Sequence, residues 1–337
     1  MNTIKLSYAY LRAYLHSITF RRVFTIIALR ISFTLSWIAK KHICMPHPAF
    51  ISIEPTNTCN LHCPECPTGN KTSTVPKGIM NNTTYNKIIS ETHKHCWFIN
   101  LYFQGEPFLN PNIYSFISQA HTHRIISSTS TNAHYITSEN AEKIVDSGLT
   151  KIIVSLDGYN QETYEKYRKG GSFEKAVNGI KALSHAKDKA HSLYPIIEVQ
   201  CLLFKHTEQH MSEIKSIGYK NGADIVLFKT AQFYNKENIS LLPRQKSHSR
   251  YIYNSEKETL ELRKKPRNRC WRMWSSVVFT WNGTVLPCCF DKNHSHAYGN
   301  IHTHTISDIL CSEKAQSFKK QVHTKRTVFD ICRNCTS

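Results

Sequence analysis

The sequence predicts an α/β protein in two parts: a partial barrel of six strand–helix units, followed by a small cysteine-rich domain that contains a β-hairpin. Three observations support this. Short β-like runs alternate with segments of helical spacing from about residue 50 to residue 230. The alternation stops after about residue 231. The segment 270–337 then opens and closes with cysteines around a hairpin signal.

The first 45 residues differ from the rest, because they contain seven Lys or Arg and no acidic residue. Val23–Ala39 is apolar but has only 17 residues, with Arg30 in its middle. A spanning helix needs about 20 apolar residues, and a central arginine costs roughly 2.5–3.5 kcal/mol. The flanking cations are Arg21, Arg22, Lys40 and Lys41. A helix lying on a membrane surface and a helix packed across the end of the domain are both consistent with this pattern; a true span ranks third.

The alternating region predicts parallel β/α units joined by right-handed crossovers. The expected strands are 50–54, 97–103, 124–131, 151–157, 196–204 and 224–230, and the expected helices are roughly 83–95, 111–122, 137–147, 173–189 and 207–220. Six strands are too few for a closed eight-stranded barrel, so we expect a partial barrel or an open sheet. Loops at the carboxyl ends of the strands should then carry the chemistry.

These patterns predict four segments in the chain. We expect an N-terminal helical segment at 1–45, the barrel at 46–230, a polar and basic linker at 231–269, and the cysteine-rich domain at 270–337. Within that last domain, Asn282-Gly283 lies between two apolar runs, which is the strongest short hairpin signal.

Composition limits the class of protein. The chain has 337 residues, 40% of them hydrophobic and 20% charged, as expected for a folded protein. The 43 Lys and Arg exceed the 24 Asp and Glu, for a net charge of +19. Such a surplus fits nucleic acid, an anionic membrane surface or an acidic substrate, and equally a solvated basic surface, since no long Lys/Arg block occurs.

Twelve cysteines indicate metal binding or disulfides. A secreted disulfide scaffold is usually shorter and carries a signal peptide, whereas no small-residue cleavage site follows the basic N-terminus here. The cysteines also group as C-x3-C and C-x2-C. We therefore expect metal ligands in a reducing compartment, the cytoplasm.

Cys59, Cys63 and Cys66 follow the first predicted strand. Structural zinc usually takes four protein ligands, and a thioredoxin-like pair would leave Cys59 unexplained. A [4Fe–4S] cluster normally takes four thiolates, so three leave one iron open for a substrate or cofactor.

This C-x3-C-x2-C arrangement resembles the radical S-adenosylmethionine (radical SAM) enzymes, and the resemblance covers roughly residues 50–230. "QGEP" ends the second strand, "STSTNA" the third and "VSLDG" the fourth, as in that family. The resemblance implies a [4Fe–4S] cluster on the three cysteines and SAM bound by Gly105, Glu106, Pro107, Ser130, Thr131, Asn132, Ser155, Asp157 and Arg168. Glu65 departs from the pattern, because many relatives have an aromatic or apolar residue there.

These residue types suit a zwitterion beside a sulfonium. Arg168 can grip a carboxylate in bidentate fashion, and Glu106 can take an ammonium group. The small residues Gly105 and Gly158 let a ligand approach the backbone. Taken singly, each has an ordinary explanation: a strand-end carboxylate, a turn at Asp157-Gly158, a solvated helix arginine. Only the occurrence of these motifs in order at successive strand ends, together with the three cysteines, supports a SAM site.

The tail contains a second cysteine group, with Cys270, Cys288 in "GTVLPC", and Cys332 and Cys335 in "CRNC". It resembles a shortened form of the SPASM extension of radical SAM enzymes, which implies one auxiliary [4Fe–4S] cluster on these four residues, with Cys289 as the alternative to Cys288. Zinc is the competing metal, because four cysteines alone do not separate it from iron. We expect the ungrouped Cys44, Cys96, Cys201 and Cys311 to be small buried residues.

The resemblance implies a reaction type. An electron from a reductase such as a flavodoxin or ferredoxin cleaves SAM to a 5′-deoxyadenosyl radical, which takes a hydrogen atom from the substrate. An auxiliary cluster that accepts the next electron would make the reaction an oxidation. A thiol that returns a hydrogen atom, with Cys201 or Cys289 as candidates, would make it an epimerisation.

The substrate is less defined. The short apolar N-terminus does not look like a peptide-recognition domain, which favours a small molecule, a glycoside or a lipid-linked substrate. A radical SAM peptide or protein maturase is the alternative. A zinc-ribbon nucleic-acid-binding protein and a non-catalytic iron–sulfur scaffold leave the serial SAM motifs unexplained, so we expect no nucleic-acid partner.

Overall fold

The computed structural model describes residues 3–39, 43–234, 236–254, 256, 258–264 and 266–335. It divides into two compact units, each assembled from separate stretches of the chain. The first comprises residues up to Ala13, Cys59–Ser73 and Ser128–Lys264, and the second comprises Tyr14–Thr58, Thr74–Ser127 and the chain from Lys265 onward. The boundaries between the four expected segments stay predictions.

The first unit contains four parallel strands in the order β3-β4-β5-β6. They are β3 (Ile126–Thr131), which enters this unit at Ser128, β4 (Lys151–Ser155), β5 (Ile196–Leu203) and β6 (Ile225–Thr230). The helices between them are α5 (Ser138–Asp146), α6 (Gln161–Glu165), α7 (Phe173–Lys189) and α8 (Met211–Lys220). Short helices η2 (Lys236–Leu241) and η3 (Lys246–His248) and an antiparallel pair, β7 (Tyr251–Asn254) and β8 (Thr259–Leu262), follow.

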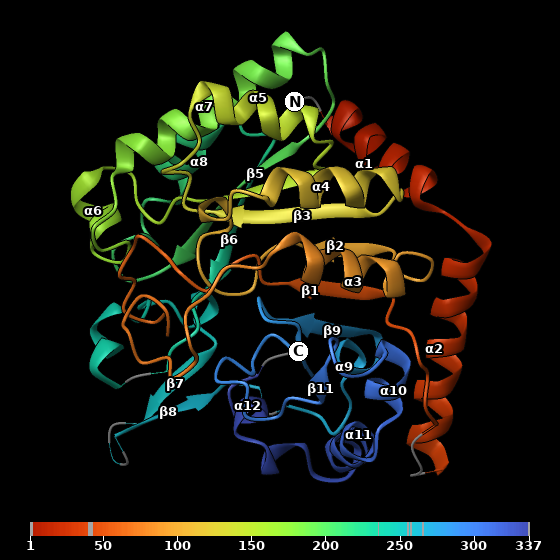
Figure 1. Cartoon of the computed structure of the whole chain (residues 1–337). Coiled ribbons are helices and arrows are strands. Elements are labelled where there is room, and N and C mark those ends of the chain that lie inside the picture. The colour runs from red at the N-terminus through yellow and green to blue at the C-terminus, as the bar shows by residue number, and fades with distance from the viewer. Residues whose placement is uncertain are drawn as a thin grey trace. The chain divides into compact units, whose positions relative to one another are not determined.

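In the second unit, β1 (Phe50–Ile53) pairs in parallel with β2 (Phe98–Asn100) on one side and with β9 (Ser276–Phe279) on the other. β10 (Thr284–Leu286) runs antiparallel to β9, and β11 (Gly299–Asn300) antiparallel to β10. Gly283 has φ +81° in the β9–β10 turn, which confirms the hairpin at Asn282-Gly283. The cysteine-rich tail therefore extends the same sheet as β1 (Figure 1).

The helices of the second unit are α2 (Phe20–Ala39), α3 (Asn82–Thr92), η1 (Pro107–Leu109), α4 (Ile113–Thr122), α9 (Trp271–Ser275), α10 (Ile306–Cys311), α11 (Glu313–Lys325), η4 (Arg326–Val328) and α12 (Asp330–Arg333). The helix α1 (Thr3–Ser17) begins in the first unit and ends in the second. α2 has the length and mean hydropathy of a membrane span, with 33% of its apolar window buried.

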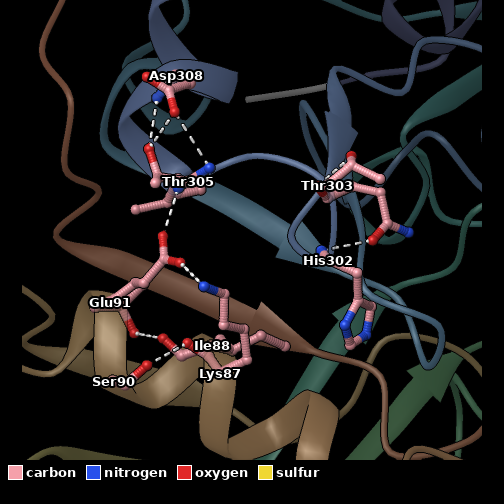
Figure 2. A network of polar contacts seen from close by, with 11 residues as sticks. Lys87, Ile88, Ser90, Glu91, His302, Thr303, Thr305 and Asp308 are labelled. Atoms are coloured by element: carbon pink, nitrogen blue, oxygen red, sulfur yellow. Dashed lines mark hydrogen bonds and ion pairs between the residues drawn. The ribbon is translucent and has the colours of Figure 1, made fainter.

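Side-chain caps define several helix starts and tie the tail to α3. Thr305 and Asp308 form a capping box at α10. Glu91 of α3 pairs with Lys87 at 2.9 Å, and its Oε2 accepts the backbone N–H of Ile306 over 2.6 Å (Figure 2). A carboxylate at a helix N-terminus is favourable, so this contact anchors the start of α10 on α3.

The predicted α/β alternation is confirmed, since all six strands and all five helices are present and their ends differ by a few residues from those expected. The N-terminal segment contains two helices, where the hydropathy pattern predicted one around Val23–Ala39. The segment 231–269, expected as a polar and basic linker, contains η2, η3, β7 and β8. Lys40 and Lys41, the expected C-terminal anchors of the apolar helix, lie outside the described residues.

One cysteine prediction is wrong. Cys44 and Cys311 are joined by a disulfide across a sequence separation of 267, and both are only half-buried, so they are not small core residues. Sequence spacing could not reveal this pair, because disulfide geometry depends on two Cα atoms being close in space, here 5.6 Å apart. Cys96 and Cys201 are fully buried and free, as predicted.

Candidate functional site

The three cysteines of the C-x3-C-x2-C group lie on the loop that follows β1. Cys63 is buried, and Cys59 and Cys66 are half-buried. The loop is shaped by a backbone hydrogen bond from Cys66 N–H to Cys63 O, at 3.1 Å, and by the Leu61 N–H, which lies 3.4 Å from Cys59 Sγ. A buried apolar cluster that includes Leu61, Tyr167 and Phe204 packs against all three cysteines. These thiols are therefore largely shielded from bulk water.

Arg168 connects this loop to the end of β4. Its Nε donates to Asp157 Oδ2 over 2.5 Å, and its Nη1 lies 3.9 Å from Cys63 Sγ. Asp157 is fully buried, and its other oxygen accepts the Leu202 N–H over 2.6 Å. Burial by itself lowers the pKa of Arg168, but the facing Asp157 carboxylate outweighs it and holds that pKa well above its ordinary value.

Asn132, directly after β3, reaches the same loop. Its Nδ2 donates to Asn60 Oδ1 over 2.9 Å and lies 3.9 Å from Cys59 Sγ. Its backbone oxygen lies 2.9 Å from His134 Nδ1, while His134 Nε2 accepts the Ser172 N–H over 2.7 Å. Burial lowers the pKa of His134, so the ring is neutral and Nδ1 carries the proton that it donates to Asn132.

The other strand-end residues of the first unit lie on the same edge of its parallel strands. Ser130 and Thr131 end β3 and Ser155 ends β4; Ser130 and Ser155 are half-buried and Thr131 is buried. Thr131 Oγ1 accepts the Ala133 N–H over 2.9 Å. Parallel strands bring their carboxyl ends together, so the structure gathers these hydroxyls with Asn132 and Arg168.

The Gly105–Pro107 segment belongs to the second unit and is described there by itself. Glu106 is buried, caps η1 by accepting the Phe108 N–H at 3.3 Å, and donates its own N–H to Thr58 O at 2.8 Å. Gly105 has φ +74°, and a Cβ there would lie 2.4 Å from Thr56 O. The Gly105–Pro107 segment is therefore held against Thr56 and Thr58 by backbone contacts within its own unit.

At the two glycines that we expected to let a ligand approach the backbone, protein atoms fill the space that a Cβ would take. A Cβ at Gly158 would lie 2.4 Å from the Tyr164 backbone nitrogen, and the space at Gly105 is filled by the Thr56 and Thr58 carbonyls. Their small size therefore serves close chain-to-chain packing.

Glu65, which departs from the family pattern, turns inward and is buried. It accepts the Tyr234 N–H over 2.6 Å and the Asn238 side-chain amide over 2.5 Å. This carboxylate therefore ties the segment after β6 to the cysteine loop.

A cavity of about 490 Å³ opens beside the same loop. Its lining is polar and includes His62, Asn70, Lys71 and Lys169. The volume lies in the range of small-molecule sites.

In the second unit, the tail cysteines converge. One small cavity is lined by Cys270, Cys288, Cys332 and Cys335 together with apolar side chains such as Met273 and Phe318. Cys289 does not line it; its Sγ lies 3.2 Å from Arg272 Nη1. Burial raises the pKa of Cys288 well above its ordinary value, as it raises the pKa of Cys270 and Cys332.

The donors around these thiols fit an anionic cluster. Arg326, which is buried, donates to Cys335 Sγ over 2.9 Å, and the Met273 and Phe290 N–H groups lie 3.5 and 3.4 Å from Cys270 and Cys288 sulfurs. Hydrogen bonds to sulfur and exclusion of water are the protein's means of tuning such clusters. Within the described residues, no three His, Cys, Asp or Glu side chains are arranged around a single ion. The assignment of ligands stays a prediction.

Comparison with protein families identifies the chain. Residues 53–202 match the radical SAM superfamily, and residues 270–336 match SPASM, an iron–sulfur cluster-binding domain. The chain is a radical SAM enzyme with a C-terminal SPASM domain. The radical SAM domain implies a [4Fe–4S] cluster and SAM, and the SPASM domain implies an auxiliary iron–sulfur cluster.

Curated relatives show several activities. The chain is 31% identical over 140 residues to an AdoMet-dependent heme synthase of Methanosarcina barkeri and 29% identical over 139 residues to the mycofactocin maturase MftC of Mycolicibacterium smegmatis. These matches span 41% of this chain but only 40% and 35% of the relatives. A 2-deoxy-scyllo-inosamine dehydrogenase of Niallia circulans is 21% identical over 294 residues, which cover 86% of this chain and 93% of that protein.

Solved structures share the fold. The complex of BtrN with AdoMet and 2-DOIA matches with a TM-score of 0.52 and 20% identity, covering 86% of this chain and 93% of BtrN. SuiB of Streptococcus suis bound to S-adenosylmethionine matches with a TM-score of 0.62 and 11% identity, covering 87% and 73%. The radical SAM fold, a partial barrel followed by the SPASM domain, is thereby confirmed.

The sequence did not single out several residues that lie in or near the two cysteine groups, each within its own unit. They are Asn60, His134, Arg272 and Arg326, which the sequence does not distinguish from ordinary solvated polar or basic residues. Asn60 lies inside the cysteine loop as "CNLHC", and Arg272 lies two residues after Cys270. Their closeness in sequence to cysteines that we expect to be ligands was the available signal for these two residues. Arg326 gave none.

Proposed function

We propose that this radical SAM/SPASM protein is a dehydrogenase that oxidises a C–H bond in a small polar molecule, a glycoside or a lipid-linked substrate. The observation that carries the proposal is that four cysteines line one small, largely apolar cavity of the SPASM domain. Four protein thiolates complete the coordination of a single four-iron cluster, which leaves no iron for a substrate. A fully ligated cluster is suited to accept an electron.

The overlap with the inosamine dehydrogenase supports this choice. Its match covers 93% of the dehydrogenase, whereas the maturase match covers 35% of MftC. The polar cavity of about 490 Å³ beside the cysteine loop also has the size of a small-molecule site.

We assign the SAM-binding roles to this chain's own residues as follows. Cys59, Cys63 and Cys66 hold the cluster, and bound SAM supplies the 5′-deoxyadenosyl radical that takes the substrate hydrogen. Arg168 binds the SAM carboxylate and is held in place by Asp157, both of whose oxygens are engaged by the protein. Glu106, Gly105 and Pro107 bind the ammonium group.

Asn132, Ser130, Thr131 and Ser155 contribute hydrogen bonds to the rest of SAM. Cys201 is a poor hydrogen donor for an epimerisation, because its thiol is fully buried in β5. Cys289 is half-buried beside Arg272 and is the thiol to test if the reaction proves redox-neutral.

Two cellular assignments belong to this proposal. The first electron comes from a flavodoxin or ferredoxin. The protein acts on the cytoplasmic side of a membrane surface, which its basic and acid-free N-terminal segment would favour.

The test is anaerobic reconstitution followed by incubation with dithionite, SAM and deuterated candidate substrates. We expect about eight irons per chain, and one deuterium transferred to 5′-deoxyadenosine for each ketone formed from an aminocyclitol or sugar alcohol. The matched control is the Cys270→Ala variant, which should still cleave SAM but form no ketone. Deuterium transfer from a peptide instead would favour the maturase alternative, and SAM cleavage without any transfer from the alcohols would contradict the dehydrogenase.

A further inference from the structure

The helix α2 has its polar side turned toward the protein. Its buried residues are Arg22, Thr25, Leu29, Ser32, Phe33 and Ser36. A surface helix normally buries its apolar side and exposes its polar side. Four of the six buried positions here are polar or charged, so α2 is inverted with respect to that rule.

Arg22 holds the N-terminal end of α2. It is 2% exposed and donates to four backbone oxygens, those of Ser17, His93, His123 and Arg124, over 2.6–2.9 Å. These four hydrogen bonds engage both terminal nitrogens of the buried guanidinium, and withdrawing the arginine would remove all four from the carbonyls that accept them.

Further polar contacts continue along the same side. Thr25 Oγ1 lies 2.8 Å from His95 Nδ1. Ser32 Oγ donates to Ile43 O over 2.6 Å and accepts from Trp274 Nε1 over 3.0 Å. Just beyond the helix, the Cys44–Cys311 disulfide ties the chain to α10. Polar groups thus attach the helix to its unit from Arg22 to Ser36.

The outward side of α2 is a stripe of large apolar residues. They are Phe20, Phe24, Ile27, Ile31, Leu35 and Ile38, at successive intervals of 4, 3, 4, 4 and 3 residues. Their exposed fractions range from 47% to 86%. Contiguous apolar patches of this kind are unusual on a monomeric soluble surface and mark an interaction site.

The charges around the stripe point to one kind of partner. The first acidic residue in the chain is Glu54, so nothing in or before α2 carries a negative charge, whereas Arg21 and Arg30 are exposed on the helix. Arg30 stacks on the Trp271 ring at 3.7 Å, which keeps its guanidinium at the flank of the apolar stripe. A second copy of the chain would bring like charges together, whereas anionic lipid headgroups would complement them.

A transmembrane orientation does not fit the same contacts. Moving α2 into a bilayer would break the four Arg22 hydrogen bonds and expose Thr25, Ser32 and Ser36 to lipid. A helix α2 that lies flat on the membrane keeps these hydrogen bonds, because only its apolar stripe enters the interfacial region.

We propose that α2 is a monotopic docking helix: its outward stripe inserts into the interfacial region of an anionic membrane while its polar side stays bound to the protein. The inference is independent of the reaction catalysed. It specifies a surface and an orientation that the acid-free composition of the N-terminal segment does not.

The test is flotation of the full-length reconstituted protein with vesicles of phosphatidylcholine alone and of phosphatidylcholine with 30% phosphatidylglycerol. We expect binding to the anionic vesicles, and at least tenfold less binding for the triple variant Phe24→Gln, Ile31→Gln, Ile38→Gln. Glutamine keeps helix propensity, so the helix is retained. Arg21→Gln should weaken binding to anionic vesicles about fivefold, since each cation near such a surface is worth about 1 kcal/mol.

The matched control is Ile79→Gln, Ile252→Gln, Val328→Gln, which removes three apolar side chains that are 43–50% exposed and do not belong to α2. It should float like the unmodified protein. Iron content and SAM cleavage should be unchanged in both triple variants, so a failure of docking is distinguishable from a failure of the proposed reaction.

Equal flotation of the α2 variant and the unmodified protein would overturn the proposal. So would resistance to an alkaline carbonate wash, which would indicate a span, and so would a stable dimer that the α2 substitutions dissociate and that does not bind vesicles, which would indicate a second copy on the stripe.

Discussion

Arg168 Nε donates to Asp157 Oδ2 over 2.5 Å, and the two residues lie eleven positions apart, at the start and the end of the segment between β4 and α7. Asp157 is fully buried while the Arg168 side chain is 18% exposed. The carboxylate is therefore committed to the protein, and the guanidinium retains a face for a ligand. We read the pair as a positioning residue and the group that it positions.

Replacing Asp157 by Asn should weaken SAM binding about 10- to 100-fold, because a hydrogen bond to a charged group is worth about 1.5–3 kcal/mol. Isothermal titration of the reconstituted protein with SAM measures this. Iron content should not change, and the exposed Asp146→Asn should behave like the unmodified protein. Unaltered SAM affinity in Asp157→Asn would show that Arg168 needs no positioning.

The cavity of the SPASM domain distinguishes Cys288 from Cys289. Only Cys288 of the two lines it together with Cys270, Cys332 and Cys335. Cys288→Ala should therefore reduce the iron content from about eight to about four per chain, and Cys289→Ala should leave it at about eight. Iron and sulfide analysis after anaerobic reconstitution decides; the opposite pattern would make Cys289 the ligand.

Glu54 gives the protein a pH-dependent stability. Burial, only partly offset by hydrogen bonds from the Trp281 and Gln104 backbone, raises the pKa of Glu54 from 4.5 to about 7. Between these two values the folded chain keeps a proton that the unfolded chain has lost, so the free energy of unfolding falls as pH rises. The total loss is about 3 kcal/mol, complete above about pH 7.

Glu54→Gln removes this titration. The variant should match the unmodified protein near pH 4.5 and exceed it by about 3 kcal/mol at pH 8. Urea unfolding followed by tryptophan fluorescence at both pH values measures the difference. The exposed Glu313→Gln serves as control. A constant difference between Glu54→Gln and the unmodified protein across the range would rule out a shifted Glu54.

The disulfide between Cys44 and Cys311 predicts a thiol count. Denatured, cluster-free protein should show ten free thiols without reductant and twelve after reduction. The double variant Cys44→Ser, Cys311→Ser should show ten in both conditions and unfold with about 2–4 kcal/mol less stability. Twelve thiols without reductant would mean that the pair stays reduced.

Glu65 should control the order of the segment after β6. Because its carboxylate accepts from Tyr234 and Asn238, Glu65→Gln should lose about 1 kcal/mol of local stability and raise the rate of limited proteolysis near 234–242 about fivefold. The exposed Glu237→Gln provides the comparison. Equal cleavage rates in the two variants would assign Glu65 no such role.

The sequence by itself determined the strand–helix alternation, the Asn282-Gly283 hairpin, the cysteine triad and its strand-end partners, because each is encoded by local periodicity, turn chemistry or short spacing. The parallel arrangement then follows from chain connectivity, which brings Asn132, Ser155 and Arg168 to one edge of the first unit's strands.

Only the tertiary structure decided the contacts between residues that lie far apart in the sequence. The pairing of Cys44 with Cys311, the choice of Cys288 over Cys289 as a cavity-lining residue, and the approach of Arg326 to Cys335 all depend on which segments pack together. The apolar helix shows the difference most plainly. The hydropathy pattern predicted the helix, but only the tertiary structure showed that Arg22, Thr25 and Ser32 face inward. Their partners are backbone carbonyls and a histidine ring from distant segments, and a hydropathy pattern contains no information about such partners.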